Sequence, residues 1–459
     1  MKTKLSSQSG QSGSVLLMAV VITAVIGVVL VAYLGLVSSQ NQSTMRSQAW
    51  NATIPVMEAG IEDAMAHLNA HGSTNLACDG WITVGNLYVM QRTVGENYYV
   101  VTISNYVAGS SNNNPMIDSR GYVNMPVLTA SADHTLLAAA GVPANGYMAR
   151  GIRVTTGKNA LFAKGLVAKG QIDLKGNNIA TDSFDSTDSA YSTAGRYDST
   201  KHKANGDVAT DSGLVNSVNV GNADILGHVS TGPGGSVAIG PNGSIGDLAW
   251  GGRNGIEPGF VKDDMNVIFP DVPVPFTSAT PPNSGSGYDY LLTSGNYQVT
   301  GDLDLKNKTM YVSGSNTVLY VTGNFSMSGG AQITLGPGAT LKLYVAGSSG
   351  SIGGNGVINP GWALNFIYYG LPSNTSLSFA GNAAFTGAIY APNADFSLNG
   401  GGNNTYDFVG ASVTKTATMN GHFNFHYDEA LSKFGPMRGY VVTSWNEMTP
   451  AEVASFSLE

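Results

Sequence analysis

The chain has 459 residues, a formal net charge of −8 and only 11% charged residues. Its charges form no acidic or basic block, so nucleic acid is not expected as a partner. The 59 glycines come without a collagen period or a proline excess, and they indicate many tight turns between short strands in a mainly β chain. A single cysteine, Cys78, excludes a disulfide framework within the chain and a thiolate metal cluster. We interpret it as a small, partly buried residue and not as a reactive thiol.

An uninterrupted apolar stretch covers residues 15–37. A bilayer-spanning helix needs about 20 such residues, so this stretch is predicted to cross a membrane once. Lys2 and Lys4 precede it without an acidic residue, which by the positive-inside rule places the N-terminus in the cytoplasm and exports the body. The predicted location is therefore the inner membrane, with the body in the periplasm or at the cell surface. A secretory signal cut near Ser38 or Ser39 is the alternative, although such signals have apolar cores of only about 7–15 residues.

A short polar leader, residues 1–13, ends in Gly13, and the apolar helix begins at once with Ser14. In these features the N-terminus resembles type IV pilins. The resemblance implies that a prepilin peptidase cuts after Gly13 and methylates Ser14, and that the apolar helix packs in a filament core. The fifth mature residue of pilins is usually a glutamate that pairs with a neighbour's N-terminal amine, and here that position holds Met18. This departure points to a minor subunit, because some minor or tip subunits lack the glutamate.

The N-terminal helix is predicted to continue beyond the membrane, over residues 14–71, with Pro55 interrupting and kinking it. Residues 57–68, MEAGIEDAMAHL, are similar to the end of the N-terminal helix in PilX-type minor pilins. His67 and His71 lie four apart, a spacing that could hold a metal, but the sequence shows no third ligand and a solvated helix end is the favoured interpretation. One helical face is indicated by apolar residues three or four apart, namely Trp50, Ile54, Met57, Ile61, Met65 and Leu68.

Three segments follow the helix. Strand-like runs over residues 72–156 predict a small antiparallel sheet, which matches the helix-then-sheet plan of a pilin head. Over residues 157–269, short apolar pairs separated by Gly, Asn or Asp predict a first glycine-rich solenoid block, with a loop excursion near 182–207. Residues 270–287 contain five prolines among small polar residues and are predicted to be a linker or an extended strap.

Two interleaved repeats over residues 288–432 give the strongest internal signal. Alternating strands closed by Gly or Asn turns, about 21–24 residues apart, predict a parallel β-helix. Residues 433–459 are predicted to be a C-terminal tail. Residues 385–402 and the segments after them are similar to an uncharacterised repeat domain that accompanies PilX-type N-termini. The first repeat begins at Leu319, Leu343, Phe366, Ala388 and Val409, and the second at Phe325, Ser351, Leu377, Phe396 and Ala417.

The repeat block offers few groups for chemistry. Solvated strand faces and a polar cap on the last coil are the favoured interpretations of its charged residues. The sequence contains no nucleophile elbow, phosphate loop, HExxH motif or dinucleotide fingerprint. No catalytic residue, metal or cofactor is therefore assigned, and the chain is not expected to be an enzyme. The groups considered for a cation or an acid–base pair are Asp302, Asp304 and Lys306, then Asp395, Asp407 and Lys415, and finally His422, His426, Asp428 and Glu429.

Together these patterns predict a structural, minor pilin-like subunit of a type IV pilus or a type II secretion-like assembly. Its expected partners are other pilin-like subunits, the inner-membrane assembly machinery and the prepilin peptidase. A carbohydrate-binding adhesin is the alternative, with Tyr368, Tyr369 and Tyr390 suited to stacking on surface polysaccharide. A polysaccharide lyase or hydrolase ranks third. An outer ladder of aromatic residues would favour the adhesin, and a pocket with converging carboxylates would favour the enzyme.

Overall fold

The computed structural model describes residues 12–71, 75–107, 114–125, 146–175, 179–250, 252–380, 385–399, 406–420 and 423–455. The chain forms two compact units: unit 1 comprises Met1–Lys158 and Gly439–Glu459, and unit 2 comprises Asn159–Arg438. The predicted class, mainly β with one long N-terminal helix, is confirmed. In the sequence, unit 2 is an insertion that separates the last strand of unit 1 from the strands before it. The segment 433–459, predicted to be a tail, therefore returns a strand to the first sheet.

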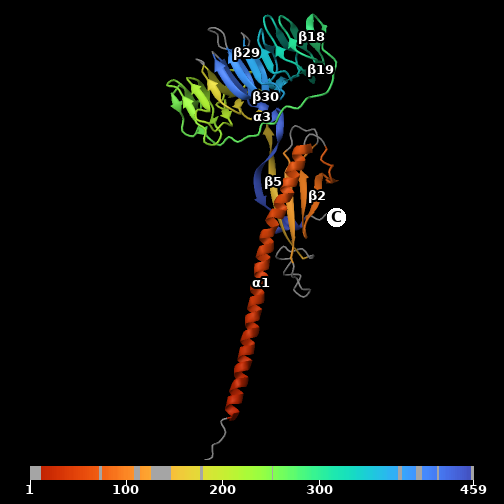
Figure 1. Cartoon of the computed structure of the whole chain (residues 1–459), viewed down its shortest axis with the longest axis vertical. Helices are drawn as coiled ribbons and strands as arrows, with labels where there is room; N and C mark the ends of the chain where they lie inside the picture. The colour runs from red at the N-terminus through yellow and green to blue at the C-terminus, as the bar shows by residue number, and fades with distance from the viewer. Residues whose placement is uncertain are drawn as a thin grey trace, which may run out of the picture. The chain divides into compact units, whose positions relative to one another are not determined.

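Unit 1 joins one long helix, α1 (Ser12–His71), to a sheet (Figure 1). The pairings from the first to the fifth strand are antiparallel, as predicted. A short helix, α4 (Pro450–Ala454), ends the described chain and is capped by Thr449, whose hydroxyl accepts a hydrogen bond from the Glu452 N–H. In sheet order the strands are β1 (Ile82–Val84), β2 (Leu87–Val94), β3 (Asn97–Ser104), β4 (Met116–Asn124), β5 (Tyr147–Ala160) and β33 (Met437–Glu447).

Helix α1 has an exposed part and a packed part. Its large apolar residues from Val15 to Leu36 are each 50–72% exposed. From Ala49 onward the helix buries one face against β3 and β4. The helix is continuous through Pro55, so the predicted interruption is not observed. Proline removes one backbone hydrogen bond, and the buried contacts of neighbours such as Val56 outweigh that loss.

Two glycines allow α1 to lie close to β4. A Cβ atom on Gly60 would lie 2.3 Å from Ser119 Oγ, and one on Gly121 would lie 2.9 Å from the backbone nitrogen of Met57. The Ser119 hydroxyl donates a hydrogen bond to the Met57 carbonyl oxygen at 2.7 Å. The Glu-Ala-Gly segment noted in the sequence thus supplies a close contact between helix and sheet, which a larger side chain would prevent.

Unit 2 is a parallel β-solenoid (Figure 1), and its strand pairings define three faces. From one end of the solenoid to the other, face 1 contains β19 (Gly295–Val299), β22 (Thr317–Val321), β25 (Leu341–Val345), β28 (Phe366–Gly370), parts of β30 (Phe385–Asn399) and β31 (Tyr406–Asn420), β6 (Leu166–Ala168), β9 (Val208–Thr210), β12 (Val229–Ser230) and β16 (Val261–Lys262). Face 2 contains β20 (Leu303–Asp304), β23 (Phe325–Ser326), β26 (Ser349–Ile352), β29 (Ser376–Ala380), the ends of β30 and β31, β7 (Ile172–Leu174), β10 (Val218–Gly221) and β13 (Val237–Ile239).

Face 3 has two parts. The first part contains β17 (Asn283–Gly285), β18 (Tyr288–Leu292), β21 (Thr309–Val312), β24 (Gln332–Leu335) and β27 (Val357–Ile358). The second part contains β32 (Phe423–Asp428), β8 (Ala180–Phe184), β11 (Asp224–Leu226), β14 (Ser244–Gly246) and β15 (Gly255–Ile256). Two short helices, η1 (Ala363–Asn365) and α3 (Ala430–Phe434), lie outside the coils.

The two sequence repeats correspond to faces 1 and 2. On face 1, Leu319 pairs with Leu343. On face 2, Leu377 pairs with Phe396, which in turn pairs with Ala417. These side chains are all buried within one continuous apolar core, as the predicted alternation of inward and outward residues requires.

The two glycine-rich blocks, predicted as separate segments, form one continuous solenoid. Strand β31 pairs with β6 and β7, and β32 pairs with β8, all in parallel. The chain therefore enters at the middle of the solenoid, winds to the end at β16, crosses to the opposite end at β17 and winds back until β32 meets β8. We call the pairings of β31 and β32 with β6, β7 and β8 the seam. It gives hydrogen-bond partners to strand edges that two separate blocks would expose.

The crossing segment, residues 263–282, runs along the outside of the solenoid, and we call it the strap (green trace in Figure 1). It overlaps the linker or strap predicted over residues 270–287. Val272 of the strap is only 5% exposed, and the Gln298 N–H donates a hydrogen bond to the Thr280 carbonyl oxygen at 3.0 Å. The segment is therefore packed into unit 2 and does not act as a free linker.

Candidate functional sites

The predicted processing site lies at the start of α1. Gly13 and Ser14 belong to the first turn of the helix, which begins at Ser12, and Met18 is 65% exposed. The most apolar part of this helix is not buried, and the helix is long and apolar enough to cross a membrane. Leader residues 1–11, with both predicted cytoplasmic lysines, lie outside the described residues. Cleavage after Gly13 and methylation of Ser14 stay predictions.

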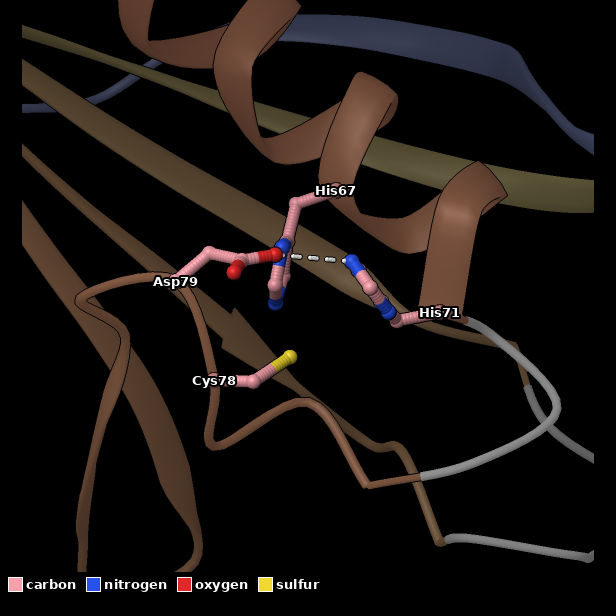
Figure 2. A group of neighbouring side chains, drawn as sticks. All are labelled: His67, His71, Cys78 and Asp79. Atoms are coloured by element: carbon pink, nitrogen blue, oxygen red, sulfur yellow. Dashed lines mark ion pairs between the residues drawn. The ribbon is translucent and has the colours of Figure 1, made fainter.

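At the other end of α1, predicted to be solvated, Asn69 and Ala70 are exposed and His71 is partly exposed, but His67 is covered. His67 is 7% exposed, and its ring stacks on Trp81 with the ring centres 4.8 Å apart. The loop after the helix brings Cys78 and Asp79 to His67 and His71, so that one potential ligand atom from each of these four residues lies within 4.8 Å of the others (Figure 2). Sequence reasoning missed Cys78 and Asp79 because helical spacing says nothing about a loop that folds back on the helix.

A ladder of tyrosines lies on the outer side of face 1. Tyr320, Tyr344, Tyr369 and Tyr390 occupy paired positions in four successive coils. The rings of Tyr344 and Tyr369 stack with their centres 4.7 Å apart. An aromatic ladder of this kind was the feature expected of a sugar-binding face.

The strap covers this ladder. The Tyr390 hydroxyl donates a hydrogen bond to the Pro270 carbonyl oxygen at 2.7 Å, and Val272 packs in the same apolar cluster as the ladder. Tyr369 and Tyr390 are 8% and 3% exposed, and burial raises the pKa of Tyr369 well above its usual range. Tyr368 lies in the solenoid core at 0% exposure. The predicted exposure of these three tyrosines is therefore wrong, because one points inward and the strap covers the other two.

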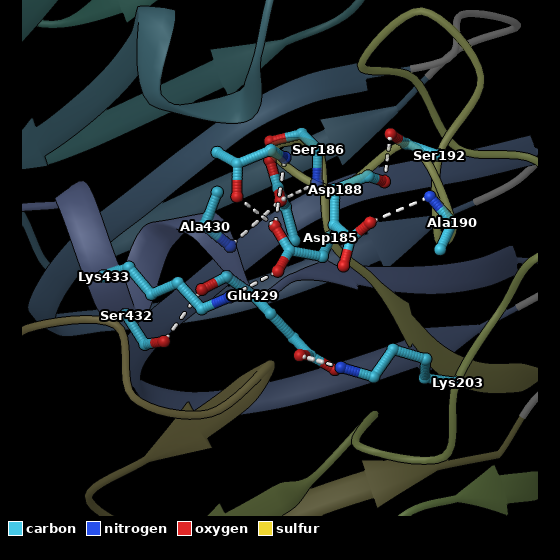
Figure 3. Close-up of polar contacts among 12 residues, drawn as sticks. Asp185, Ser186, Asp188, Ala190, Ser192, Lys203, Glu429, Ala430, Ser432 and Lys433 are labelled. Carbon is cyan, nitrogen blue, oxygen red and sulfur yellow. Dashed lines mark hydrogen bonds and ion pairs between the residues drawn. The ribbon is translucent and has the colours of Figure 1, made fainter.

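Charged residues gather beside the seam, where the excursion 182–207 meets β32 and α3 (Figure 3). The Glu429 carboxylate accepts hydrogen bonds from the Ser183 hydroxyl at 2.9 Å and the Asn205 amide at 2.7 Å, and it forms an ion pair with Lys203. These contacts satisfy a carboxylate that is largely buried.

Two further carboxylates complete this group. Burial acts to raise the pKa of Asp185, but hydrogen bonds from Lys433 and Thr187 outweigh it and hold the pKa below its usual range. Asp428 is fully buried, and burial raises its pKa although its Oδ1 accepts hydrogen bonds from the backbone N–H groups of Ser186 and Ala430. Together these contacts attach the excursion 182–207 to the end of β32 and to α3.

His426 lies between two carboxylates of this region. Its Nδ1 is 2.5 Å from Asp182 Oδ1, and its Nε2 is 3.4 Å from Asp407 Oδ1. The Tyr197 ring stacks on the imidazole at 3.6 Å, and its hydroxyl donates a hydrogen bond to Asp182 at 2.6 Å. Burial by itself lowers the pKa of His426, but hydrogen bonds to the two carboxylates outweigh it and hold the pKa above its usual range.

The expectation of a polar cap on the last coil is wrong for His426, Asp428 and Glu429, because β8 covers β32 and the coil lies inside the solenoid. The carboxylates do converge here, as an enzyme would require. Asp182, Asp428 and Glu429 are 0–9% exposed, and each accepts hydrogen bonds from neighbouring residues. His422 lies outside the described residues.

The remaining carboxylates of the repeat block link neighbouring coils. Asp304 accepts hydrogen bonds from the Ser326 hydroxyl and the Lys306 N–H, and these bonds hold its pKa below the usual range. Asp302 likewise accepts a hydrogen bond from the Asn324 N–H at 2.7 Å. Both agree with the expected solvated strand face.

One further pair, Lys415 and Asp395, lies on the surface. The Lys415 Nζ is 3.0 Å from Asp395 Oδ2, and both side chains are about half exposed. An exposed pair of this kind contributes little to stability. Its two groups belong to adjacent coils, so we interpret it as another contact between coils.

A polar recess of about 440 Å³ opens beside β9, β12 and β16. Asp207 Oδ2 lies 2.8 Å from Lys164 Nζ, and its Oδ1 accepts a hydrogen bond from the His228 N–H at 2.9 Å. The His228 ring lies flat on Phe260, with the ring centres 4.4 Å apart. Lys262 and Asp264 also lie in its wall, so the recess carries two lysines and two carboxylates and has the size to hold a small polar ligand. Sequence reasoning missed it because its residues come from separate coils and form no motif.

Comparison with known proteins yields two findings. Residues 277–434 match a family described as a domain of unknown function, DUF7305, and this range covers the solenoid from the end of the strap to α3. No curated protein matches the chain. Among solved structures, the competence-associated pilin ComZ from Thermus thermophilus is similar at 12% identity over 86% of this chain and 96% of that chain, with a TM-score of 0.17. At that TM-score the likeness carries no argument about this chain.

Proposed function

We propose that this chain is a minor, pilin-like structural subunit that is anchored in the inner membrane by α1 and contains an antiparallel head and a β-solenoid. The observation that carries the proposal is the contrast within α1. Apolar residues such as Leu16 and Val31 are 72% and 71% exposed, whereas residues after Ala49 are buried against the sheet. Apolar surface on this scale needs lipid or another apolar helix around it.

The same helix defines the proposed partners. A span that contains no charged residue from Val15 to Val37 can pack in the membrane and later among the helices of other pilin-like subunits of a type IV pilus or a type II secretion-like assembly. Processing by a prepilin peptidase between Gly13 and Ser14, with the N-terminus in the cytoplasm, would release it for assembly. Met18 in place of the pilin glutamate favours a minor position over repeated use along a filament.

We further propose that the solenoid is structural and not catalytic. Most of its clustered carboxylates have basic partners beside the seam, since Asp182 lies against His426, Glu429 against Lys203 and Asp185 against Lys433. The aromatic ladder that would favour a sugar-binding adhesin is covered by the strap. If the chain binds surface polysaccharide, the recess around Asp207 and His228 is the place that offers room and charge.

Cross-linking in membranes tests the proposed association. In a cysteine-free Cys78→Ser background, Leu30→Cys places one thiol on the exposed apolar helix, and Leu214→Cys places one on the solenoid surface, where Leu214 is 72% exposed. We expect short bifunctional thiol reagents to join Leu30→Cys to helices of pilin-like subunits carrying a matching cysteine, and Leu214→Cys to give no such product. Equal products from both, or none from Leu30→Cys, would contradict the proposal.

A further inference from the structure

We propose that unit 1 binds a zinc ion between His67, His71, Cys78 and Asp79. The four potential ligand atoms lie within 4.8 Å of one another. In a tetrahedral zinc site with bonds of about 2.0–2.3 Å, ligand atoms are about 3.3–3.8 Å apart. Closing the group around an ion therefore needs movements of about 1 Å. Imidazole, thiolate and carboxylate are the three ligand types that zinc binds in proteins.

The helix already orients its two histidines. His67 and His71 are four residues apart, so they lie on one face of the last turns of α1. His67 Nε2 lies 2.8 Å from the Leu76 carbonyl oxygen, and as the donor of this bond it leaves Nδ1 as the metal-binding nitrogen. Its ring also lies nearly parallel to Trp81, at an angle of 9°. A backbone carbonyl on one ring nitrogen is the usual support of a metal-binding histidine.

The loop fixes the other two ligands. The Cys78 N–H donates a hydrogen bond to the Leu76 carbonyl oxygen, and the Trp81 N–H donates to the Cys78 carbonyl oxygen, both at 2.9 Å. Asp79 has φ = +53° and Gly80 has φ = +90°. The left-handed conformation is uncommon outside glycine, but aspartate is one of the residues that adopt it most readily, and this turn points the Asp79 carboxylate toward His71.

The four side chains converge from different directions on a common centre (Figure 2). Asp79 Oδ2 lies 2.9 Å from His71 Nε2, an ion pair that a divalent cation would replace by binding both atoms. The Asp79 and His71 side chains are 67% and 34% exposed, so an ion can reach the group from solvent. Apolar packing of Leu76 and Trp81, both nearly fully buried, supports the site from behind.

Cobalt substitution in the full-length chain, purified in detergent under reducing conditions with any affinity tag removed, tests this assignment. We expect one Co²⁺ per chain, with visible bands of a tetrahedral site and a near-ultraviolet band from thiolate to cobalt, both displaced by Zn²⁺. Cys78→Ser should abolish the thiolate band. Asp79→Asn, at an exposed position where folding is not at risk, should weaken Zn²⁺ binding about tenfold or more in competition with a chromophoric chelator.

His202→Ala is the matched control, because His202 lies in unit 2 and contacts the Ser199 carbonyl oxygen. It should leave the cobalt spectrum and the Zn²⁺ affinity unchanged. The absence of a thiolate band in the wild-type chain would overturn the proposal. An equal loss of affinity in His202→Ala and Asp79→Asn would also overturn it, since the ion would then be bound adventitiously.

Discussion

Replacing His426 by alanine removes the group that holds two carboxylates together at the seam. Asp182 would lose a partner at 2.5 Å and keep the Tyr197 hydroxyl, whereas Asp407 would lose a weaker contact at 3.4 Å. Removing one partner of a buried ion pair costs about 3–5 kcal/mol. The exposed side of Asp407, 48% for its side chain, reduces that penalty, so we expect a loss near the lower limit, about 3 kcal/mol.

The loss is measured by unfolding the full chain in urea and monitoring the unfolding of unit 2 through hydrogen exchange of β8 and β32. With a denaturant dependence of about 3 kcal/mol per molar urea for a unit of this size, the midpoint should fall by about 1 M. His202→Ala, on the same excursion, should leave the midpoint within about 0.2 M, the range of ordinary surface substitutions. In the double variant His426→Ala with Asp182→Asn, the two losses should be less than additive by about 1 kcal/mol or more. Fully additive losses would refute the coupling.

Three further outcomes follow from named contacts. The pKa of His426 is raised in the folded chain. Its contribution to stability is therefore complete below the ordinary imidazole pKa of about 6.5 and is lost as the pH rises through the pKa of the folded state. The urea midpoint should fall over that pH window in the wild type and not in His426→Ala. Gly60→Val should destabilise unit 1 by about 1–3 kcal/mol through overpacking, seen as lost exchange protection in β4, whereas Gly35→Val, with nothing within 4 Å of an added Cβ, should not change that protection. Val272→Asp should cost about 2 kcal/mol and expose the strap to limited proteolysis, and Val274→Asp, at a residue 56% exposed, should leave the cleavage rate as in the wild type.

Local patterns in the sequence predict much of the fold. Alternating apolar residues with Gly or Asn turns at a steady spacing predicted the parallel coils, because each coil has the same inward and outward positions. The pairing of Leu319 with Leu343 follows directly from that repeat. The long helix was likewise predicted from local sequence. Only the interruption at Pro55 was wrong, because packing of the helix on the sheet offsets the lost hydrogen bond and is not visible in the sequence.

The seam could not be predicted in the same way. It joins residues such as His426 and Asp182, which are 244 positions apart, and nothing local to either segment states that the two blocks share a coil. The zinc ligands were hidden for a related reason. Helical spacing revealed His67 and His71, but the loop that brings Asp79 to them is held by tertiary contacts such as the stacking of Trp81 on His67. A linker or an extended strap was predicted over residues 270–287, but the packing of this segment over the tyrosine ladder was not predicted.

The mature N-terminus, determined by mass spectrometry after expression with a prepilin peptidase, tests the pilin-like role most directly. Gly13→Leu removes the predicted cleavage glycine, and Gly10→Leu is its matched control within the leader. We predict cleavage between Gly13 and Ser14 with a methylated Ser14 in the wild type and in Gly10→Leu, and an uncut chain in Gly13→Leu. An intact N-terminus in the wild type, or a cut near Ser39, would contradict the account.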